Sequence, residues 1–214
     1  MEIHAYSEEY VLSAQRVVGD MFDFAIVTLG LDADWFAAMF KSSDVSLQIG
    51  CGNPAYVAGH NGCELARMIL ESNGIDTTEA QDVMYIDKSP EFWSGWATAY
   101  YQWETGSTFQ YVFNNICLSR IIEMYGVYHE MDIENYVCAL DTILRETSME
   151  TRLQYYRKKL GLSQSQLASK SDVPIRQIQL FEQRKREINR TQADTLLKLS
   201  KALYCNMEDL LEQG

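Results

Sequence analysis

Apolar residues recur at helical spacing through most of the first 146 residues of the chain. One segment places them along a single helix face: Val11, Val18, Met21, Phe22 and Ala25. Asp32 suits a helix N-cap and precedes a second such set: Trp35, Phe36, Met39 and Phe40. Alternating apolar and polar residues are scarce, and residues 83–86 are the one strand-like segment. The pattern predicts an all-α protein with a helical N-terminal domain.

The segment from Ser89 to Gly106 carries a complete set of helix boundaries. Ser89 suits the N-cap, Pro90 the first helical position, and Gly106 the position just beyond the end. Large aromatic residues fall on one face of this predicted helix: Trp93, Trp96, Tyr100 and Trp103. We interpret this aromatic stripe as part of the core. A ligand pocket or a partner surface is the alternative, because Trp and Tyr dominate interface hot spots.

Further helices are predicted over residues 109–125, with a break at Asn114 and Asn115, and over residues 132–146. The composition then changes within a short polar stretch, residues 145–150, that lacks Gly and Pro. We interpret this stretch as a tight junction between two domains. The predicted domains are residues 1–147 and residues 148–214.

A glycine-rich segment, residues 50–62, precedes a helix that is predicted to begin near Cys63. Such a loop can hold a phosphate on backbone N–H groups at a helix start. However, the segment lacks the Lys-Ser/Thr pair of a P-loop and the G-x-G-x-x-G spacing of a dinucleotide site. We favour a structural turn between packed helices, with phosphate binding as the alternative.

Charge divides the chain more sharply than its total suggests. The net charge is −12, which argues at first against DNA as a partner. Residues 1–149 carry 6 Lys and Arg against 22 Asp and Glu, a net charge of −16. Residues 150–214 carry 12 against 8, a net charge of +4. The positive charge therefore lies in one small segment.

The remaining chemistry-bearing residues form no recognised catalytic or metal-binding pattern. The five cysteines are scattered and never spaced C-x-x-C, so we expect reduced, small core residues. His60 and His129 each have a nearby carboxylate in the sequence, Glu64 and Glu130, without a third group to complete a site. No segment suggests a membrane span or a signal peptide. We predict a cytoplasmic protein that is not an enzyme and needs no metal or cofactor.

The last third of the chain predicts three short helices in close succession. The first is basic and amphipathic and ends before Gly161. Ser163 and Gln166 form a capping-box arrangement at the start of the second. After a polar turn, Pro174 opens the third, residues 175–182. Two short helices joined by a turn of a few residues predict a helix-turn-helix.

At these residues the sequence resembles the XRE class of helix-turn-helix domains, the lambda-repressor and Cro-like family. The resemblance covers residues 151–211 and rests on three motifs: Arg157-x-x-Leu160-Gly161-Leu162-Ser163-Gln164-x-x-Leu167-Ala168, Ile178-x-x-Phe181-Glu182, and Leu196-Leu197-x-Leu199-x-x-Ala202-Leu203 with Leu210-Leu211. It implies a five-helix bundle. The family usually has Gly at the position of Asp172, and Trp or Leu is commoner than Phe at position 181. Asp tolerates a left-handed backbone, so the turn stays feasible.

The resemblance also implies which residues meet DNA. Leu167, Ile178 and Phe181 fill the core, and Ala168 is small because two helices cross there. Gln164 is expected to contact a phosphate. Four positions early in the third helix are expected to contact bases: Ile175, Arg176, Gln177 and Gln179. For Leu180, base contact and packing at the helix edge remain equal alternatives.

A basic run follows the third helix, with Arg184, Lys185, Arg186 and Arg190 before Thr191. A charge run is often only a solvated loop. Because the loop after the recognition helix lies beside the DNA backbone in this family, we interpret the four cations as phosphate contacts. Thr191, near the start of the fourth helix, is expected to add a contact at the helix terminus.

One recognition helix per chain predicts a homodimer on double-stranded DNA with two half-sites. For the acidic domain, three hypotheses stay open. It binds a basic protein toxin, it senses a small molecule through the aromatic stripe, or it is an enzyme, which we consider least favoured. Gly52-Asn53-Pro54-x-Tyr56-x-x-Gly59 and Trp96-x-x-x-Tyr100-Tyr101-Gln102-Trp103-x-Thr105-Gly106 are loosely similar to regulators of toxin-antitoxin operons. The favoured prediction is an autorepressing, antitoxin-like regulator.

Overall fold

The computed structural model describes residues 4–77, 80–82, 87–147 and 150–212, and these contain helices and no strand. The all-α prediction is therefore confirmed. Residues 83–86, the predicted strand-like segment, lie outside the described residues. The chain divides into two compact units, residues 2–144 and residues 145–214.

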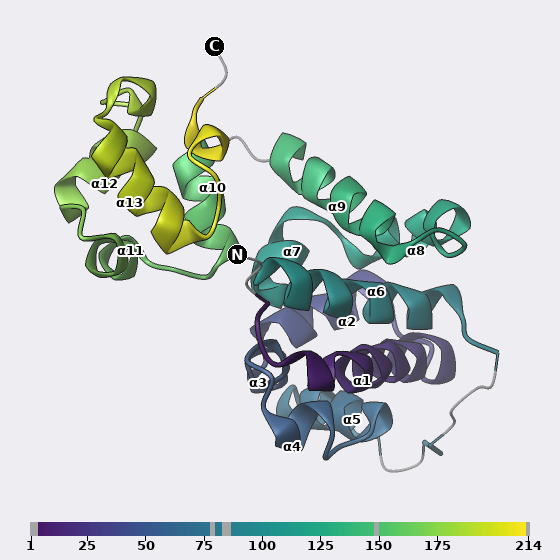
Figure 1. Cartoon of the computed structure of the whole chain (residues 1–214). Coiled ribbons are helices and arrows are strands. Elements are labelled where there is room, and N and C mark those ends of the chain that lie inside the picture. The colour runs from purple at the N-terminus through teal and green to yellow at the C-terminus, as the bar shows by residue number, and fades with distance from the viewer. Residues whose placement is uncertain (1–3, 78–79, 83–86, 148–149, 213–214) are drawn as a thin grey trace. The chain divides into compact units, whose positions relative to one another are not determined.

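The N-terminal unit is built from successive helices joined by short turns (Figure 1). Its elements are η1 (Glu8–Tyr10), α1 (Val11–Asp23), η2 (Phe24–Thr28), α2 (Ala33–Ser42), α3 (Asp44–Gly50), α4 (Pro54–Val57), α5 (Gly62–Ser72), α6 (Pro90–Thr105), α7 (Phe109–Asn115), α8 (Leu118–Tyr128) and α9 (Ile133–Thr147), which continues past the unit boundary at residue 144. The predicted break in the helix over residues 109–125 is confirmed, because α7 ends at Asn115 and α8 begins at Leu118.

The centre of this unit is the contact between α1 and α6, which lie side by side. Two glycines allow the close approach. A Cβ atom on Gly95 would lie 2.6 Å from the Val18 carbonyl oxygen, and one on Gly19 would lie 2.7 Å from the Phe92 ring. Phenylalanines fill the adjacent core, where the Phe22 and Phe40 rings meet edge to face with centroids 5.5 Å apart.

The predicted caps set the helix boundaries. The Asp32 side chain accepts a hydrogen bond from the Trp35 N–H (2.8 Å) at the start of α2. The Ser89 hydroxyl oxygen accepts one from the Phe92 N–H (2.9 Å) at the start of α6, which ends before left-handed Gly106. On α2 the core face is Phe36, Ala37 and Phe40, whereas Trp35 is 48% exposed. The helical spacing therefore assigned Trp35 wrongly to the core face, because Trp35 lies on the first turn, outside the face of α2 that packs on its neighbours.

The aromatic stripe does not form the main buried face of α6. The buried residues of α6 include small ones, among them Gly95, Ala97 and Ala99, as well as Tyr101, Gln102 and Trp103. Gly95 lets α1 come close. Trp103 is buried, while Trp93, Trp96 and Tyr100 are half-buried. Of the four stripe residues, only Trp103 lies in the core as interpreted. Its ring N–H donates a hydrogen bond to the Tyr6 carbonyl (2.9 Å).

The glycine-rich segment, residues 50–62, consists of turns on either side of the short helix α4, and its glycines serve packing. Gly62 lies against the backbone of α1, and Gly52 has a φ of 69° with its Cα facing Tyr6, so neither position has room for a side chain. Asn61 and Glu64 form a capping box at the start of α5. The backbone N–H of Asn61 and the His60 side chain together lower the pKa of Glu64. This carboxylate is therefore a helix cap bonded to an exposed histidine.

The five cysteines are free thiols. Cys63 is buried, and its burial raises the pKa of the thiol to about 11. The prediction of core cysteines is wrong for Cys51, Cys117 and Cys138, which are exposed on helix ends and outer faces. Within the described ranges, no group of three or more His, Cys, Asp or Glu side chains is placed to hold a metal ion. Across those same ranges, no helix has the length and apolar character needed to cross a membrane.

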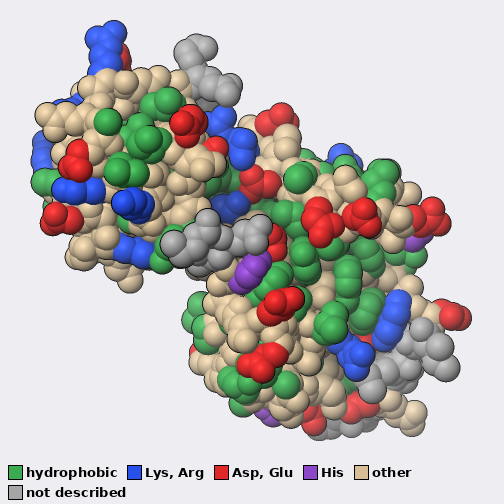
Figure 2. Space-filling view, in the orientation of Figure 1, with side chains coloured by type: hydrophobic (Ala, Val, Ile, Leu, Met, Phe, Trp, Pro, Cys, Tyr) green, Lys and Arg blue, Asp and Glu red, His purple; other side chains and the backbone are tan. Residues whose placement is uncertain are grey.

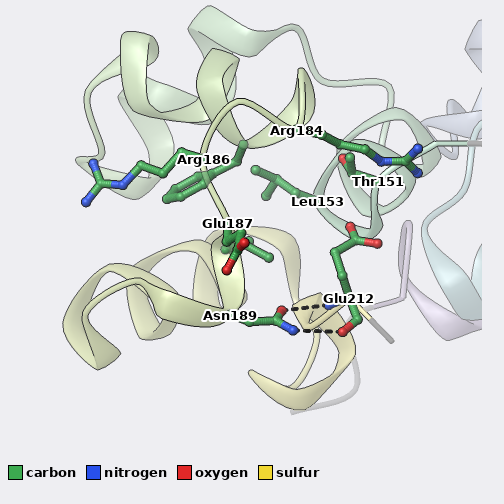
Figure 3. Close-up of a pocket in the computed structure, with 9 residues that line it drawn as sticks. Thr151, Leu153, Arg184, Arg186, Glu187, Asn189 and Glu212 are labelled. Atoms are coloured by element: carbon green, nitrogen blue, oxygen red, sulfur yellow. Dashed lines mark hydrogen bonds between the residues drawn. The ribbon is translucent and has the colours of Figure 1, made fainter. Parts of the chain in front are cut away.

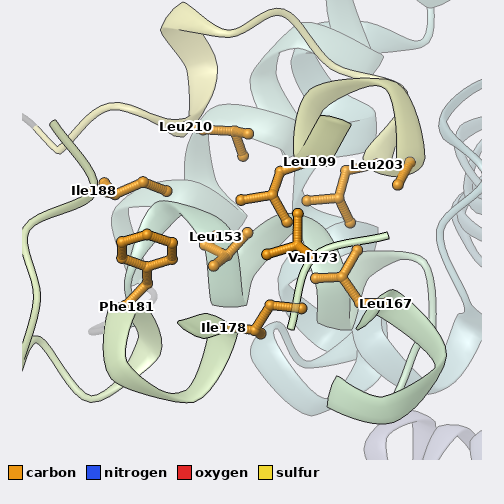
Figure 4. Packing of buried hydrophobic residues seen from close by; sticks show 10 residues of the cluster. Leu153, Leu167, Val173, Ile178, Phe181, Ile188, Leu199, Leu203 and Leu210 are labelled. Atoms are coloured by element: carbon orange, nitrogen blue, oxygen red, sulfur yellow. The ribbon is translucent and has the colours of Figure 1, made fainter. Parts of the chain in front are cut away.

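The C-terminal unit packs four helices and two single turns around one hydrophobic core (Figure 4). Its elements are α10 (Arg152–Lys159), α11 (Gln164–Ser171), α12 (Ile175–Glu182), η3 (Ile188–Arg190), α13 (Ala193–Leu203) and η4 (Glu208–Leu210). The fifth helix of the predicted bundle is the single turn η4. The buried residues of this core cluster are Leu153, Leu167, Val173, Ile178, Phe181, Ile188, Leu199, Ala202, Leu203 and Leu210.

Candidate nucleic-acid interface

The end of α10 fixes how the chain enters α11. Gly161 is left-handed, with a φ of 66°. The Gly161 N–H donates to the Lys158 carbonyl (2.9 Å) and the Leu162 N–H to the Arg157 carbonyl (3.0 Å), which is a Schellman motif. The Ser163 hydroxyl oxygen and the Gln166 side chain then cap α11 reciprocally. Both predicted boundary signals therefore form as the sequence indicates.

The turn between α11 and α12 is tight and left-handed at its first residue. Asp172, where the related family usually has Gly, adopts φ 54° and ψ 33°. Val173 is buried at 4% exposure and anchors the turn in the core, and α12 starts directly after Pro174. The expectation that Asp supports the left-handed turn is confirmed. Residues 164–182 thus form two helices joined by a short turn.

The two sides of α12 differ in character. Ile178 and Phe181 are buried in the core of the unit. Ile175 is 41% exposed and Arg176 is also exposed. Gln177, Gln179 and Leu180 are half-buried along the edge between these sides. The helix therefore presents an outward face at its first turn while its apolar face is held in the core.

A buried ion pair, which the sequence analysis missed, joins α10 to α12. The Arg157 guanidinium donates to both carboxylate oxygens of Glu182, from Nε (2.6 Å) and from Nη2 (2.7 Å). The two side chains are only 9% and 3% exposed. Arg157 also donates from Nη1 to the Leu162 carbonyl (2.7 Å), between α10 and α11. Arg157 and Glu182 both belong to the motifs that carry the resemblance, but their sequence separation hides the contact.

Gln164, the predicted phosphate contact at the start of α11, also bonds to this ion pair. Its side-chain N–H donates to the Glu182 carboxylate (2.8 Å). An amide nitrogen carries two hydrogens, so one donor stays available in principle for a phosphate. The phosphate contact of Gln164 remains a prediction. The arrangement places Gln164 and α12 in one hydrogen-bonded unit.

The basic segment after α12 does not gather its cations at one point. Arg184 is left-handed, with a φ of 55°, and closes α12 in a second Schellman motif with Lys185. Arg184 and Arg186 extend in opposite directions (Figure 3). Arg190 is exposed and pairs with Glu187 (2.7 Å). The Thr191 hydroxyl oxygen is buried and Gln192 occupies the N-cap of α13, and the contact of Thr191 with DNA stays a prediction.

Acidic and basic side chains separate between the two units. On the face that Figure 2 shows, the N-terminal unit carries many acidic side chains, and Lys and Arg are frequent on the C-terminal unit. This distribution follows the net charges of −16 over residues 1–149 and +4 over residues 150–214. DNA affinity rests largely on the neutralisation of phosphates by Lys and Arg. The C-terminal unit is the part of the chain that suits DNA.

Two short helices with a left-handed turn, an outward first turn on the second helix and a basic segment after it define a DNA-binding helix-turn-helix protein. A helix-turn-helix family model matches residues 153–210. This part of the chain is therefore a helix-turn-helix domain of the XRE type, and the protein is a DNA-binding transcriptional regulator. No curated protein and no solved structure matches the chain significantly.

Proposed function

We propose that the protein is a cytoplasmic repressor that binds its operator as a homodimer and contacts bases through the first turns of α12. The observation that carries this proposal is the outward placement of Ile175 and Arg176 beside half-buried Gln177 and Gln179. Arg176 suits guanine O6 and N7, the glutamines suit adenine, and Ile175 suits a thymine methyl. A dimer follows from the single recognition helix per chain, because specific sites usually combine two half-sites.

Phosphate contacts are proposed for Gln164 and for the four cations after α12. Lys185 and Arg186 are exposed, and so are Arg184 and Arg190. Because Arg184 and Arg186 extend to opposite sides, we propose that they meet different phosphates. The buried hydroxyl of Thr191 argues against a side-chain contact at that position.

Operator binding by alanine variants tests these roles. Arg176→Ala is expected to cost about 1–3 kcal/mol at the operator and less on unrelated DNA. Arg184→Ala is expected to weaken binding on every sequence and to lower the slope of log affinity against log salt by about 1. Lys201→Ala removes an equal charge from the exposed face of α13 and is the matched control. An equal loss for Arg176→Ala and Arg184→Ala on every sequence would overturn the assignment.

For the N-terminal unit we propose a basic protein partner, in the manner of an antitoxin that represses its own operon. The turn between α8 and α9 supports this proposal, because Val127 and Met131 are 58% and 50% exposed. Exposed carboxylates flank these apolar side chains: Glu130, Asp132 and Glu134. An apolar centre with a charged rim of one sign suits a partner surface of opposite charge.

The product of a neighbouring small gene that becomes toxic when this gene is deleted is the partner to test. We expect Glu130→Lys, Asp132→Lys and Glu134→Lys together to abolish binding and neutralisation. The control variant carries Glu8→Lys, Glu9→Lys and Glu71→Lys, which change the total charge by the same amount at other exposed positions. A wild-type protein that neither binds nor neutralises that product would refute the antitoxin role, and equal effects of both triple variants would refute the α8–α9 surface.

The alternative is a repressor that responds to a small molecule bound at the aromatic stripe. Half-buried Trp93, Trp96 and Tyr100 favour it, because they present partly accessible aromatic rings. A ligand that quenches tryptophan fluorescence, raises the melting temperature and changes operator affinity would support this function. A toxin-binding protein would show none of these responses.

A further inference from the structure

A cavity of about 470 Å³ lies within the C-terminal unit, beneath the basic segment that follows α12 (Figure 3). Its walls come from the start of α10, the end of α12, the segment 184–189 and the C-terminal stretch after η4. The residues proposed to contact bases do not line it. Its volume falls in the range of about 300–1,000 Å³ that small-molecule sites occupy.

The lining combines an apolar floor with a few polar groups at the rim. Leu153, Phe181 and Ile188 form the floor, and each of them also belongs to the core cluster of the unit. Two cations, Arg184 and Arg186, and two carboxylates, Glu187 and Glu212, also line the cavity. Each carboxylate already has a partner, because Glu187 pairs with Arg190 (2.7 Å) and Glu212 accepts from the Arg152 N–H (2.7 Å). Binding sites for small organic molecules show this combination, because apolar walls supply affinity and a few polar groups fix orientation.

Hydrogen bonds hold the wall opposite α12 in place. The Asn189 side chain donates to the Glu212 carbonyl (2.8 Å) and accepts from the Glu212 N–H (2.9 Å), as Figure 3 shows. The Glu212 carboxylate accepts from the Arg152 N–H at the start of α10 (2.7 Å). The cavity is therefore formed before any ligand arrives, which lowers the cost of ordering on binding.

Arg184 occupies a backbone position that would favour glycine. A left-handed residue with a side chain costs about 1 kcal/mol relative to glycine. The guanidinium of Arg184 extends toward Thr151 at one end of the cavity. At the other end, the Arg186 guanidinium lies 5.7 Å from the centre of the Phe181 ring. Arg184 is thus a cation at a strained backbone position, and Arg186 is a second cation beside the Phe181 ring.

We propose that this cavity binds a small organic carboxylate with an apolar body. The apolar body would lie on Leu153, Phe181 and Ile188, and the carboxylate would accept hydrogen bonds from a rim guanidinium. Guanidinium and carboxylate groups match in a two-pronged geometry that an ammonium group lacks. Bound there, the carboxylate neutralises a charge of the segment 184–190. If the segment contacts phosphates, as the proposed function states, this pairing of the carboxylate with a guanidinium lowers operator affinity.

Binding is tested on the full chain by calorimetry with 3-phenylpropionate, hexanoate and indole-3-acetate. We expect saturable binding of at least one acid and about tenfold weaker binding of the corresponding neutral amide, since the charge-assisted bonds are lost. The variant with Arg184→Gln and Arg186→Gln is expected to lose about tenfold in affinity for the acid, whereas Lys201→Gln, on the exposed face of α13 and outside the lining, keeps the wild-type value.

Absence of saturable binding for all three acids, or equal binding by the double variant, would overturn the site. Tryptophan fluorescence, followed with 3-phenylpropionate and hexanoate because indole-3-acetate fluoresces itself, separates it from the aromatic stripe, since all four tryptophans lie in the N-terminal unit. Binding at the proposed cavity leaves that fluorescence unchanged, and a ligand-dependent change counts against it. Operator affinity is measured separately. Acid binding that leaves operator affinity unchanged would refute only the claim that the acid regulates DNA binding. A protein that binds no DNA with or without the acid would refute only the proposed function.

Discussion

Replacing Glu182 by Gln tests whether the buried ion pair holds the recognition helix in place. Glu182 accepts two hydrogen bonds from Arg157, at 2.6 and 2.7 Å, and one from Gln164, at 2.8 Å. Glutamine keeps the size of the side chain but leaves the guanidinium buried without a counter-charge. Breaking a buried pair in this way costs about 3–5 kcal/mol. That is a large part of the 5–15 kcal/mol that typically stabilises a domain.

Glu187→Gln is the matched control, because Glu187 pairs with Arg190 at the surface, where the side chains are 64% and 82% exposed. An exposed pair contributes about 0–1 kcal/mol. The combined change Arg157→Met and Glu182→Leu removes both charges and is expected to regain most of the lost stability, since apolar replacement of a buried pair is often neutral or stabilising.

Urea unfolding followed by two probes measures these effects. Circular dichroism at 222 nm reports the helices of both units, whereas tryptophan fluorescence reports the N-terminal unit only, where the four tryptophans lie. Unfolding of the C-terminal unit is therefore seen by circular dichroism and not by fluorescence. We expect Glu182→Gln to lower the urea midpoint of this transition. A cost no larger than that of Glu187→Gln, or a double variant less stable than the single one, would refute the reasoning.

Two further predictions concern the N-terminal unit. Gly95→Ala is expected to cost about 1–3 kcal/mol, because its Cβ would meet the rigid Val18 carbonyl, whereas Gly19→Ala meets a ring that can turn and costs less. Gly126→Ala has open space around it and is expected to gain about 0.5–1 kcal/mol, and urea midpoints that do not rank the three in this order would contradict the packing argument. Burial raises the pKa of Asp23, although the Ser89 hydroxyl opposes the shift, so the folded state holds its proton more tightly than the unfolded state. The ionised carboxylate therefore lowers stability at neutral pH, Asp23→Asn should raise the melting temperature at pH 7, and this gain should vanish as the pH falls below the raised pKa; a gain that is constant with pH would refute the cause.

Local signals predicted the C-terminal unit well. The Gly161 cap, the Ser163 capping box and the left-handed Asp172 each depend on residues within a few positions, so the sequence specifies them directly. The Arg157–Glu182 pair depends on the packing of two helices 25 residues apart in the chain, and no local pattern shows it.

In the N-terminal unit, periodicity found the helices but misjudged the burial of some aromatic residues. Trp35 is exposed, and Trp93, Trp96 and Tyr100 are only half-buried, because Gly95 decides where α1 packs on α6. Hydrophobic size alone misses this, because close approach of two helices requires small side chains at the contact. The turn interpretation of residues 50–62 agrees with the structure for the same reason, since Gly52 and Gly62 lie where a Cβ would meet neighbouring atoms.

Three positive-φ residues in the C-terminal unit have consequences for how long the protein persists. Asp172, Arg184 and Tyr204 have φ values of 54°, 55° and 55° at the ends of α11, α12 and α13. Each costs about 1 kcal/mol relative to glycine, and well-separated costs add. The DNA-binding unit is thus less stable than the same fold would be with glycine at these three positions. We expect it to open more often than such a variant and to be cleaved faster by proteases. A regulator with a short lifetime follows its own rate of synthesis closely, so occupancy of its operator falls soon after synthesis stops.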